Sequence, residues 1–221
     1  MRNQIRSLFL VGGSMVGLMA LPNSGLSQAG LYLNAGAGVS IAEKVNVNKF
    51  GVPTSGVKAD FDPGVRLSVA GGYSLNKFLG AELETGFIYN SVKSVTGAGS
   101  VDASLSHVPI IANVVLRYEQ PDVKWVPYAG AGAGGDLSIL TLDNVGNVDG
   151  TSSSFEFAWQ AFAGVRYKLN EKMSIGAGYK YYSVDNATWD VDVVGGGTVR
   201  DAIKIGKANS RSFLLDFNFR F

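Results

Sequence analysis

The sequence predicts an all-β fold: an eight-stranded antiparallel up-and-down transmembrane β-barrel. Three observations predict it. Segments of about ten residues alternate apolar and polar side chains, short and long connections between these segments alternate strictly, and no apolar run beyond residue 29 approaches the roughly 20 residues of a membrane helix. A bilayer-spanning chain without such helices must close its sheet, because open sheet edges find no hydrogen-bond partners in lipid.

The N-terminal segment has the features of a secretion signal. Arg2 and Arg6 give it a positive start, a short apolar stretch follows, and Ser27-Gln28-Ala29 supplies small residues where a signal peptidase reads them. We expect cleavage after Ala29, which makes residues 1–29 a signal peptide and residues 30–221 the barrel. An N-terminal anchor helix is the alternative, and the stretch is short and glycine-rich for one.

Eight segments of the mature chain carry the strand pattern. In the first, Leu31, Leu33 and Ala35 share one face, whereas Tyr32 and Asn34 share the other. The eight segments are residues 31–41, 65–75, 79–90, 108–118, 125–134, 155–169, 173–182 and 212–221. Single-chain bacterial barrels have an even number of strands, as this count does.

The charged residues decide which face meets lipid. A Lys or Arg that faces lipid at the bilayer midplane costs about 2–4 kcal/mol, and several strands carry charges on their polar face. We therefore predict that the apolar face is outside and that the interior is a polar plug with paired charges. The charged residues placed inside are Arg66, Glu82, Glu84, Arg117, Glu156, Arg166, Lys168, Lys180, Asp216 and Arg220.

The connections predict the orientation in the membrane. The long connections are residues 42–60, 91–104, 136–154 and 184–207, and the short ones are 76–77, 119–124 and 170–172. Short turns of outer-membrane barrels lie in the periplasm and long loops outside. Both ends of the mature chain are therefore expected in the periplasm.

Three stretches resemble a known family. They are Ser106–Asn113, Val126–Gly132 and the C-terminal Phe217-Asn218-Phe219-Arg220-Phe221. Together they resemble the small outer-membrane β-barrel superfamily that holds the OmpA membrane domain and the opacity-type surface proteins. The resemblance implies location in the cell outer membrane, contact with outer-membrane lipid, and recognition of the alternating aromatics Phe217, Phe219 and Phe221 by the barrel-assembly machinery.

The amino-acid composition argues against several classes of function. The chain has no Cys, one His, and 19 Lys and Arg against 18 Asp and Glu, so we expect no cofactor, no metal site and no nucleic-acid partner. The predicted role is structural and surface-interacting, with adhesion or host contact through the long external loops and an extracellular ligand or host surface as partner. A narrow pore is one alternative, and a soluble secreted barrel is the main alternative for the fold.

A lipid-modifying outer-membrane enzyme is the alternative from another class. The sole histidine, His107, follows Ser106 near the outer end of a predicted strand. Adjacent strand residues face opposite sides of the sheet, so these two do not easily share a proton. We therefore predict that the protein is not an enzyme and that His107 is structural.

Overall fold

A computed structural model describes residues 30–97, 101–120, 122–145, 148–192 and 198–221. The predicted signal peptide, residues 1–29, lies outside this part of the chain. The barrel strands are β1 (Gly30–Ala42), β5 (Gly64–Ser74), β6 (Leu79–Val95), β7 (Ala103–Arg117), β8 (Trp125–Val145), β9 (Val148–Lys168), β10 (Met173–Val184) and β13 (Ala208–Arg220). Within the described residues, no helix has the length and apolar character needed to cross a membrane.

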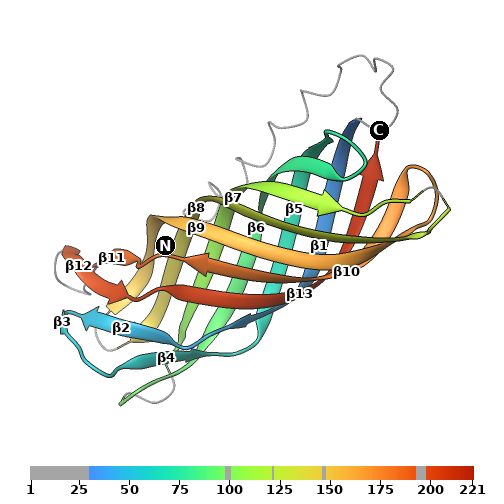
Figure 1. Ribbon diagram of the computed structural model, residues 1–221. Helices are drawn as coiled ribbons and strands as arrows, with labels where there is room; N and C mark the ends of the chain where they lie inside the picture. Colours follow the sequence, from blue (N-terminus) through green and yellow to red (C-terminus); the bar gives the residue numbers. More distant parts are fainter. Residues whose placement is uncertain (1–29, 98–100, 121, 146–147, 193–197) are drawn as a thin grey trace, which may run out of the picture.

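These eight strands form a closed antiparallel ring (Figure 1). Each strand pairs with its neighbours in the chain, and β1 pairs with both β5 and β13, so the first and last strands close the sheet. The register of the closing pair runs from Tyr32 opposite Arg220 to Ala42 opposite Ser210. The predicted all-β, eight-stranded fold is confirmed.

The burial pattern is that of a barrel in lipid. Along β13, Phe213, Leu215 and Phe217 are exposed on the outside, and Leu215 is 73% exposed. Ser212 and Asp216 alternate with them and are buried inside. Large exposed apolar side chains recur on every barrel strand, a distribution that water would penalise and a hydrocarbon layer favours.

Two of the short turns are closed by the same hydrogen-bonding pattern. The side-chain carbonyl of Asn76 accepts hydrogen bonds from the backbone N–H groups of Phe78 and Leu79, both at 2.8 Å. Asn170 does the same for Lys172 and Met173, at 2.9 and 2.8 Å. An Asx-turn of this kind reverses a chain in few residues, so the turns at this end stay tight.

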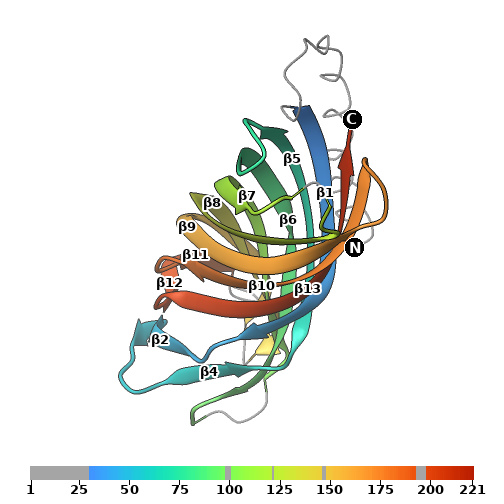
Figure 2. The ribbon, with the colours of Figure 1, turned by 45° about the vertical axis from the view of Figure 1, so that its right-hand side comes forward.

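The long connections differ from the sequence prediction, because they are largely strands rather than loops. Strands β6 to β9 continue past the predicted barrel, and five further strands join them: β2 (Val45–Phe50), β3 (Val52–Pro53), β4 (Lys58–Phe61), β11 (Thr188–Asp192) and β12 (Thr198–Ile205). β12 pairs with β2, β2 with β4, and β4 with β6. We call this part, at the end away from the short turns, the external extension (Figure 2). Outside the hydrocarbon layer the outer face is free to be polar, so the alternation that marks a membrane strand fades.

Candidate functional site

The middle of the lumen is organised around Glu84. The ammonium of Lys180 lies 2.5 and 2.7 Å from its two carboxylate oxygens, and Arg66 Nη2 lies 3.4 Å from one of them. The amides of Gln160 and Asn113 donate to the same carboxylate at 3.0 and 3.1 Å. The three charges were predicted to lie inside, and Gln160 and Asn113 lie on the same polar faces of their strands. The alternation did not indicate that the five side chains meet.

A second ion pair lies nearer the short turns. Arg166 Nε donates to Asp216 at 2.7 Å, and the hydroxyl of Tyr128 donates to the other carboxylate oxygen at 2.9 Å. Arg117 is buried beside them and donates from Nη1 to Ser74 at 3.0 Å. Glu82 is also buried, without an ion pair at contact distance among the described residues.

The remaining charges predicted to line the interior lie at its two ends and are only half-buried. Arg220 makes a two-pronged contact with Glu119, at 2.9 and 2.7 Å, and Lys168 lies 3.5 Å from the same carboxylate. Glu156, near the other end, accepts a hydrogen bond from the Ser154 hydroxyl at 2.5 Å. The structure thus brings most of the predicted interior charges into three separate clusters rather than one site.

A fourth cluster surrounds His107, and the sequence reasoning missed its central residue, Asp136. His107 Nδ1 lies 2.7 Å from Asp136 Oδ2 and 3.1 Å from the hydroxyl of Ser138. Ser138 and Tyr182 both donate to the Asp136 carboxylate, at 2.6 and 2.7 Å. The alternation along β8 continues four residues past Gly134, where the predicted strand stopped, and it would have placed Asp136 and Ser138 inside.

This cluster has the residue types of a hydrolase triad but not the geometry. A triad histidine uses one ring nitrogen for the nucleophile and the other for the acid. Here both Ser138 and Asp136 approach Nδ1, and the serine hydroxyl already donates to the carboxylate. The arrangement fixes side chains in place rather than activating a nucleophile. Among the described residues, no group of three or more His, Asp and Glu side chains could hold a metal ion.

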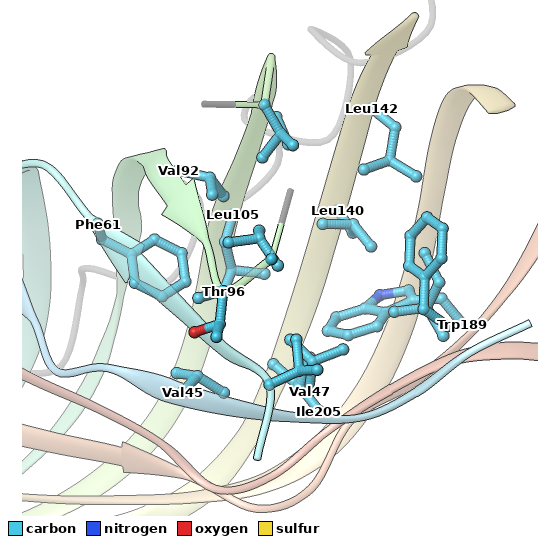
Figure 3. Close-up of a pocket in the computed structure, with 18 residues that line it drawn as sticks. Val45, Val47, Phe61, Val92, Thr96, Leu105, Leu140, Leu142, Trp189 and Ile205 are labelled. Carbon is cyan, nitrogen blue, oxygen red and sulfur yellow. The ribbon is translucent and has the colours of Figure 1, made fainter. Parts of the chain in front are cut away.

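The external extension encloses an apolar pocket of about 380 Å³ (Figure 3). Its walls come from β2, β4, β6, β7, β8, β11 and β12, so segments far apart in the sequence meet there. The lining residues are Val45, Val47, Phe50, Val57, Ala59, Phe61, Val92, Val95, Thr96, Gly97, Val101, Ala103, Leu105, Leu140, Leu142, Trp189, Ile203 and Ile205. The sequence reasoning did not predict this pocket, because it treated the segments as loops.

Trp189 joins the pocket to the His107 cluster. Its ring forms part of the pocket wall, its side chain is 1% exposed, and its Nε1 donates to the backbone carbonyl of Ser138 at 3.2 Å. The one side-chain hydroxyl in the lining, that of Thr96, is satisfied by the backbone of Lys58, which it both donates to and accepts from at 3.2 Å. The pocket therefore offers a ligand almost no free hydrogen-bonding group.

The comparisons with known proteins agree with this geometry. A family model described as "Outer membrane protein beta-barrel domain" matches residues 9–221. The chain belongs to this outer-membrane β-barrel family. The predicted location in the cell outer membrane and the predicted kinship with small outer-membrane barrels are thereby confirmed.

Solved barrels of this kind share the fold. The outer membrane protein OprG from Pseudomonas aeruginosa aligns with a TM-score of 0.62 at 16% identity, over 88% of this chain and 97% of that one. Neisserial surface protein A aligns at 0.55 and 18%, over 89% and 100%. The outer membrane protease OmpT from Escherichia coli aligns at 0.56 and 7%, over 90% and 99%. At these identities the likeness shows the fold alone. The comparison with curated protein sequences found no match.

Proposed function

We propose that this outer-membrane barrel binds a small, uncharged, apolar molecule at the cell surface, in the pocket of its external extension. The observation that carries the proposal is the pocket itself, whose lining is apolar except for one satisfied threonine hydroxyl. Ligand pockets typically measure about 300–1,000 Å³ and are lined mainly by apolar and aromatic side chains. The pocket has this size and this character.

The chemistry of the walls limits the ligand class. A charged group in the pocket would lose its hydration without gaining a partner, which is costly. A hydrocarbon or an unsubstituted ring compound has no strong hydration to lose. Its binding removes apolar surface of both ligand and pocket from water, which stabilises the complex by about 25 cal/mol per Å². Hydrocarbon-like molecules are therefore the substrate class that the pocket favours.

The layers below the pocket support binding rather than free passage. Tyr182, Gln160 and Arg66 are fully buried in the lumen, and Ile88 and Ile111 belong to one buried apolar cluster with Tyr182. An eight-stranded barrel is just wide enough for side chains to fill it. The narrow-pore alternative would require this packing to open, and planar-bilayer recordings of wild-type protein test it.

Adhesion or host contact, which the sequence predicts, remains a second proposal. It is compatible with the pocket, because the outer surface of the external extension is free to contact another surface. Deletion of residues 52–55, at the tip of the external extension, separates the two roles, because none of these residues lines the pocket. If cells with the shortened extension still bind a host surface, adhesion through this tip is wrong.

The experiment on the pocket uses Trp189 as its own reporter. The other two tryptophans, Trp125 and Trp159, are replaced by Phe, and the barrel is reconstituted in lipid nanodiscs. A brominated hydrocarbon such as bromobenzene, titrated from water, should quench the Trp189 fluorescence in a saturable way, because a heavy atom in the pocket touches the indole.

Two substitutions on one strand provide the matched control. Leu140 lines the pocket, whereas Leu137 faces outward on the same strand. Leu140→Phe fills the pocket and should abolish saturable quenching; Leu137→Phe should leave it unchanged. Equal, non-saturable quenching in all three proteins would show only partition into lipid and would refute the proposal.

A further inference from the structure

Four neighbouring strands form an apolar groove on the lipid-facing surface of the barrel. The groove crosses β1, β13, β10 and β9, ends at the start of β8, and has a volume of about 630 Å³. The small outward side chains of Ala35, Ala37 and Ala177 form its floor. The exposed side chains of Leu215 and Phe217 rise beside them. The groove is therefore a hollow in a surface that otherwise carries large apolar side chains.

The length and direction of the groove match an acyl chain of one leaflet. From β1 to β8 there are four steps between neighbouring strands, each about 4.8 Å, which makes about 19 Å. One leaflet of the hydrocarbon core is about 15 Å thick. Trp125, at the β8 end of the groove, is the first residue of its strand and lies at the short-turn edge, whereas Ala35 lies farther along β1 from that edge. The groove thus runs obliquely from the short-turn edge into the membrane.

A second groove lies beside the first one. It has a volume of about 550 Å³ and shares Ala37, Val165, Ala177 and Leu215 with the first groove. Two adjacent hollows can hold two hydrocarbon chains side by side. The pair of grooves therefore fits a diacyl lipid better than an amphiphile with one chain.

The first groove is aromatic and positively charged where it reaches the short-turn edge. The rings of Trp125 and Tyr167 line it and meet edge-to-face, with 4.9 Å between their centroids. The ammonium of Lys124 lies 5.7 Å from the centroid of the Tyr167 ring. No carboxylate of the described residues lies within ion-pair distance of this exposed lysine. Tryptophan and tyrosine are enriched at the headgroup level, and a lysine near the membrane surface attracts anionic lipid.

A second copy of the barrel fits the grooves less well than a lipid. A symmetric dimer brings the same surface of both copies together, so hollow would face hollow and the alanine floor would stay uncovered. Such a dimer would also bring two Lys124 ammonium groups to the same depth in the membrane without an anion between them. Shape and charge therefore both favour a lipid.

We propose that these grooves bind one diacyl phospholipid with a net negative headgroup, of the phosphatidylglycerol type, from the periplasmic leaflet. Its acyl chains lie along the alanine floor, and its phosphate lies against Lys124. The short turns of such barrels lie in the periplasm, so this edge of the barrel is in the phospholipid leaflet of the outer membrane. Selective binding of one lipid class goes beyond general contact with membrane lipid, and it is independent of the ligand proposed for the external extension.

Trp125 reports on the site, because its ring lines the groove. With Trp159 and Trp189 replaced by Phe, the barrel is reconstituted in phosphatidylcholine nanodiscs that contain a small, varied fraction of a lipid with brominated acyl chains. Brominated phosphatidylglycerol should quench Trp125 fluorescence at a several-fold lower mole fraction than brominated phosphatidylcholine. Added salt should narrow the difference, because it screens an exposed charge. Equal quenching by the two lipids would overturn the proposal.

Two pairs of variants locate the lipid. Lys124→Gln should abolish the preference for phosphatidylglycerol. Lys77→Gln should keep it, because this lysine lies over Phe78 in a turn between two strands that do not line the grooves. Ala177→Phe places a ring in both grooves and should reduce quenching by phosphatidylglycerol to the level of phosphatidylcholine, whereas Ala81→Phe, on the exposed face of β6, should not. A preference that persists in both Lys124→Gln and Ala177→Phe would contradict the assignment.

A cysteine at the groove tests for a second copy. The chain has no Cys, so barrels with Leu215→Cys form a disulfide with each other only through this position. In vesicles that contain phosphatidylglycerol, these barrels should stay monomeric under mild oxidation, because the bound lipid separates them. Rapid formation of a disulfide-linked dimer, together with weak quenching of Trp125 by both lipids, would assign this surface to a second copy and overturn the proposal.

Discussion

Lys180 and Glu84 are 96 residues apart in the chain, yet the lysine ammonium touches both oxygens of the glutamate carboxylate inside the barrel. Arg66 approaches the same carboxylate, so one anion serves two buried cations. Their side chains are almost fully shielded from solvent. The pairing gives the first prediction.

Replacement Glu84→Gln should destabilise the barrel strongly, because it leaves two buried cations without a counter-charge. Loss of one partner from a buried ion pair costs about 3–5 kcal/mol. Urea unfolding of barrels refolded in lipid vesicles measures this loss of stability. The control Glu156→Gln changes a half-buried residue and should cost under about 1 kcal/mol. The double variant Glu84→Gln with Lys180→Met should lose less than Glu84→Gln alone; an equal or larger loss would refute the pairing.

The sequence predicted the barrel better than it predicted the contacts inside it. Side-chain parity placed Glu84 and Lys180 on the inner face, because period-two alternation is a property of one strand. It did not say that they meet, because contacts across the lumen depend on strand tilt and register, which local sequence does not encode. Asp136 was missed for a simpler reason: the predicted strand ended at Gly134, and the connection was treated as a loop.

The apolar pocket was harder to predict from the sequence than the contacts in the lumen. Its lining comes from seven strands, and all seven lie partly or wholly within predicted loops, so no single segment carries a signature of a cavity. Within the last long connection, Trp189, Val191 and Val193 alternate with Asp190 and Asp192, which is the pattern of an extended strand. The structure places Trp189 in β11, a separate strand of the external extension, whereas Val193 lies outside the described residues.

A second prediction concerns close approach of β1 and β13. A Cβ atom added at Gly38 would lie 1.8 Å from the backbone oxygen of Phe213, whereas at Gly71 it would meet nothing within 4 Å. Gly38→Ala should therefore push the closing strands apart and destabilise the barrel by about 1–3 kcal/mol. Gly71→Ala should change stability by less than about 0.5 kcal/mol. Urea midpoints compare the two, and equal midpoints would contradict the tight closure.

A third prediction uses pH. Burial by itself would raise the pKa of Glu119 in its turn, but the hydrogen bonds and charges of Arg220 and Lys168 outweigh it and hold the pKa below its ordinary value near 4.5. A carboxyl group with a lowered pKa stabilises the fold above its unfolded pKa and loses this contribution as pH falls through the folded pKa. Stability should therefore drop below about pH 4.5. Glu119→Gln should flatten this part of the urea-unfolding profile; an unchanged acid slope would exclude Glu119 as its source.

The fourth prediction concerns the C-terminal aromatics, Phe217, Phe219 and Phe221, whose role as an assembly signal remains a prediction. The Phe221 backbone N–H donates to the Leu31 carbonyl at 3.1 Å, while its exposed ring packs edge-to-face against the ring of Phe219, with 5.2 Å between the centroids. Phe221→Ala should lower the amount of folded barrel in cells several-fold but leave refolding in detergent nearly intact. Unboiled gels of outer membranes and of refolded protein measure both. An equal loss in both settings would indicate a structural role instead.

In this barrel, apolar side chains face lipid and ionised side chains lie in the lumen. The absence of cysteine makes the test direct, because single cysteines along β13 can each carry a nitroxide label without background. Electron paramagnetic resonance in lipid vesicles then compares access to oxygen, which concentrates in the bilayer, at residues 213 to 217. Because Phe213, Leu215 and Phe217 face lipid, oxygen access should be high at these positions, and it should be low at Leu214 and Asp216, which are buried. The reverse alternation, or none, would contradict this orientation of the side chains.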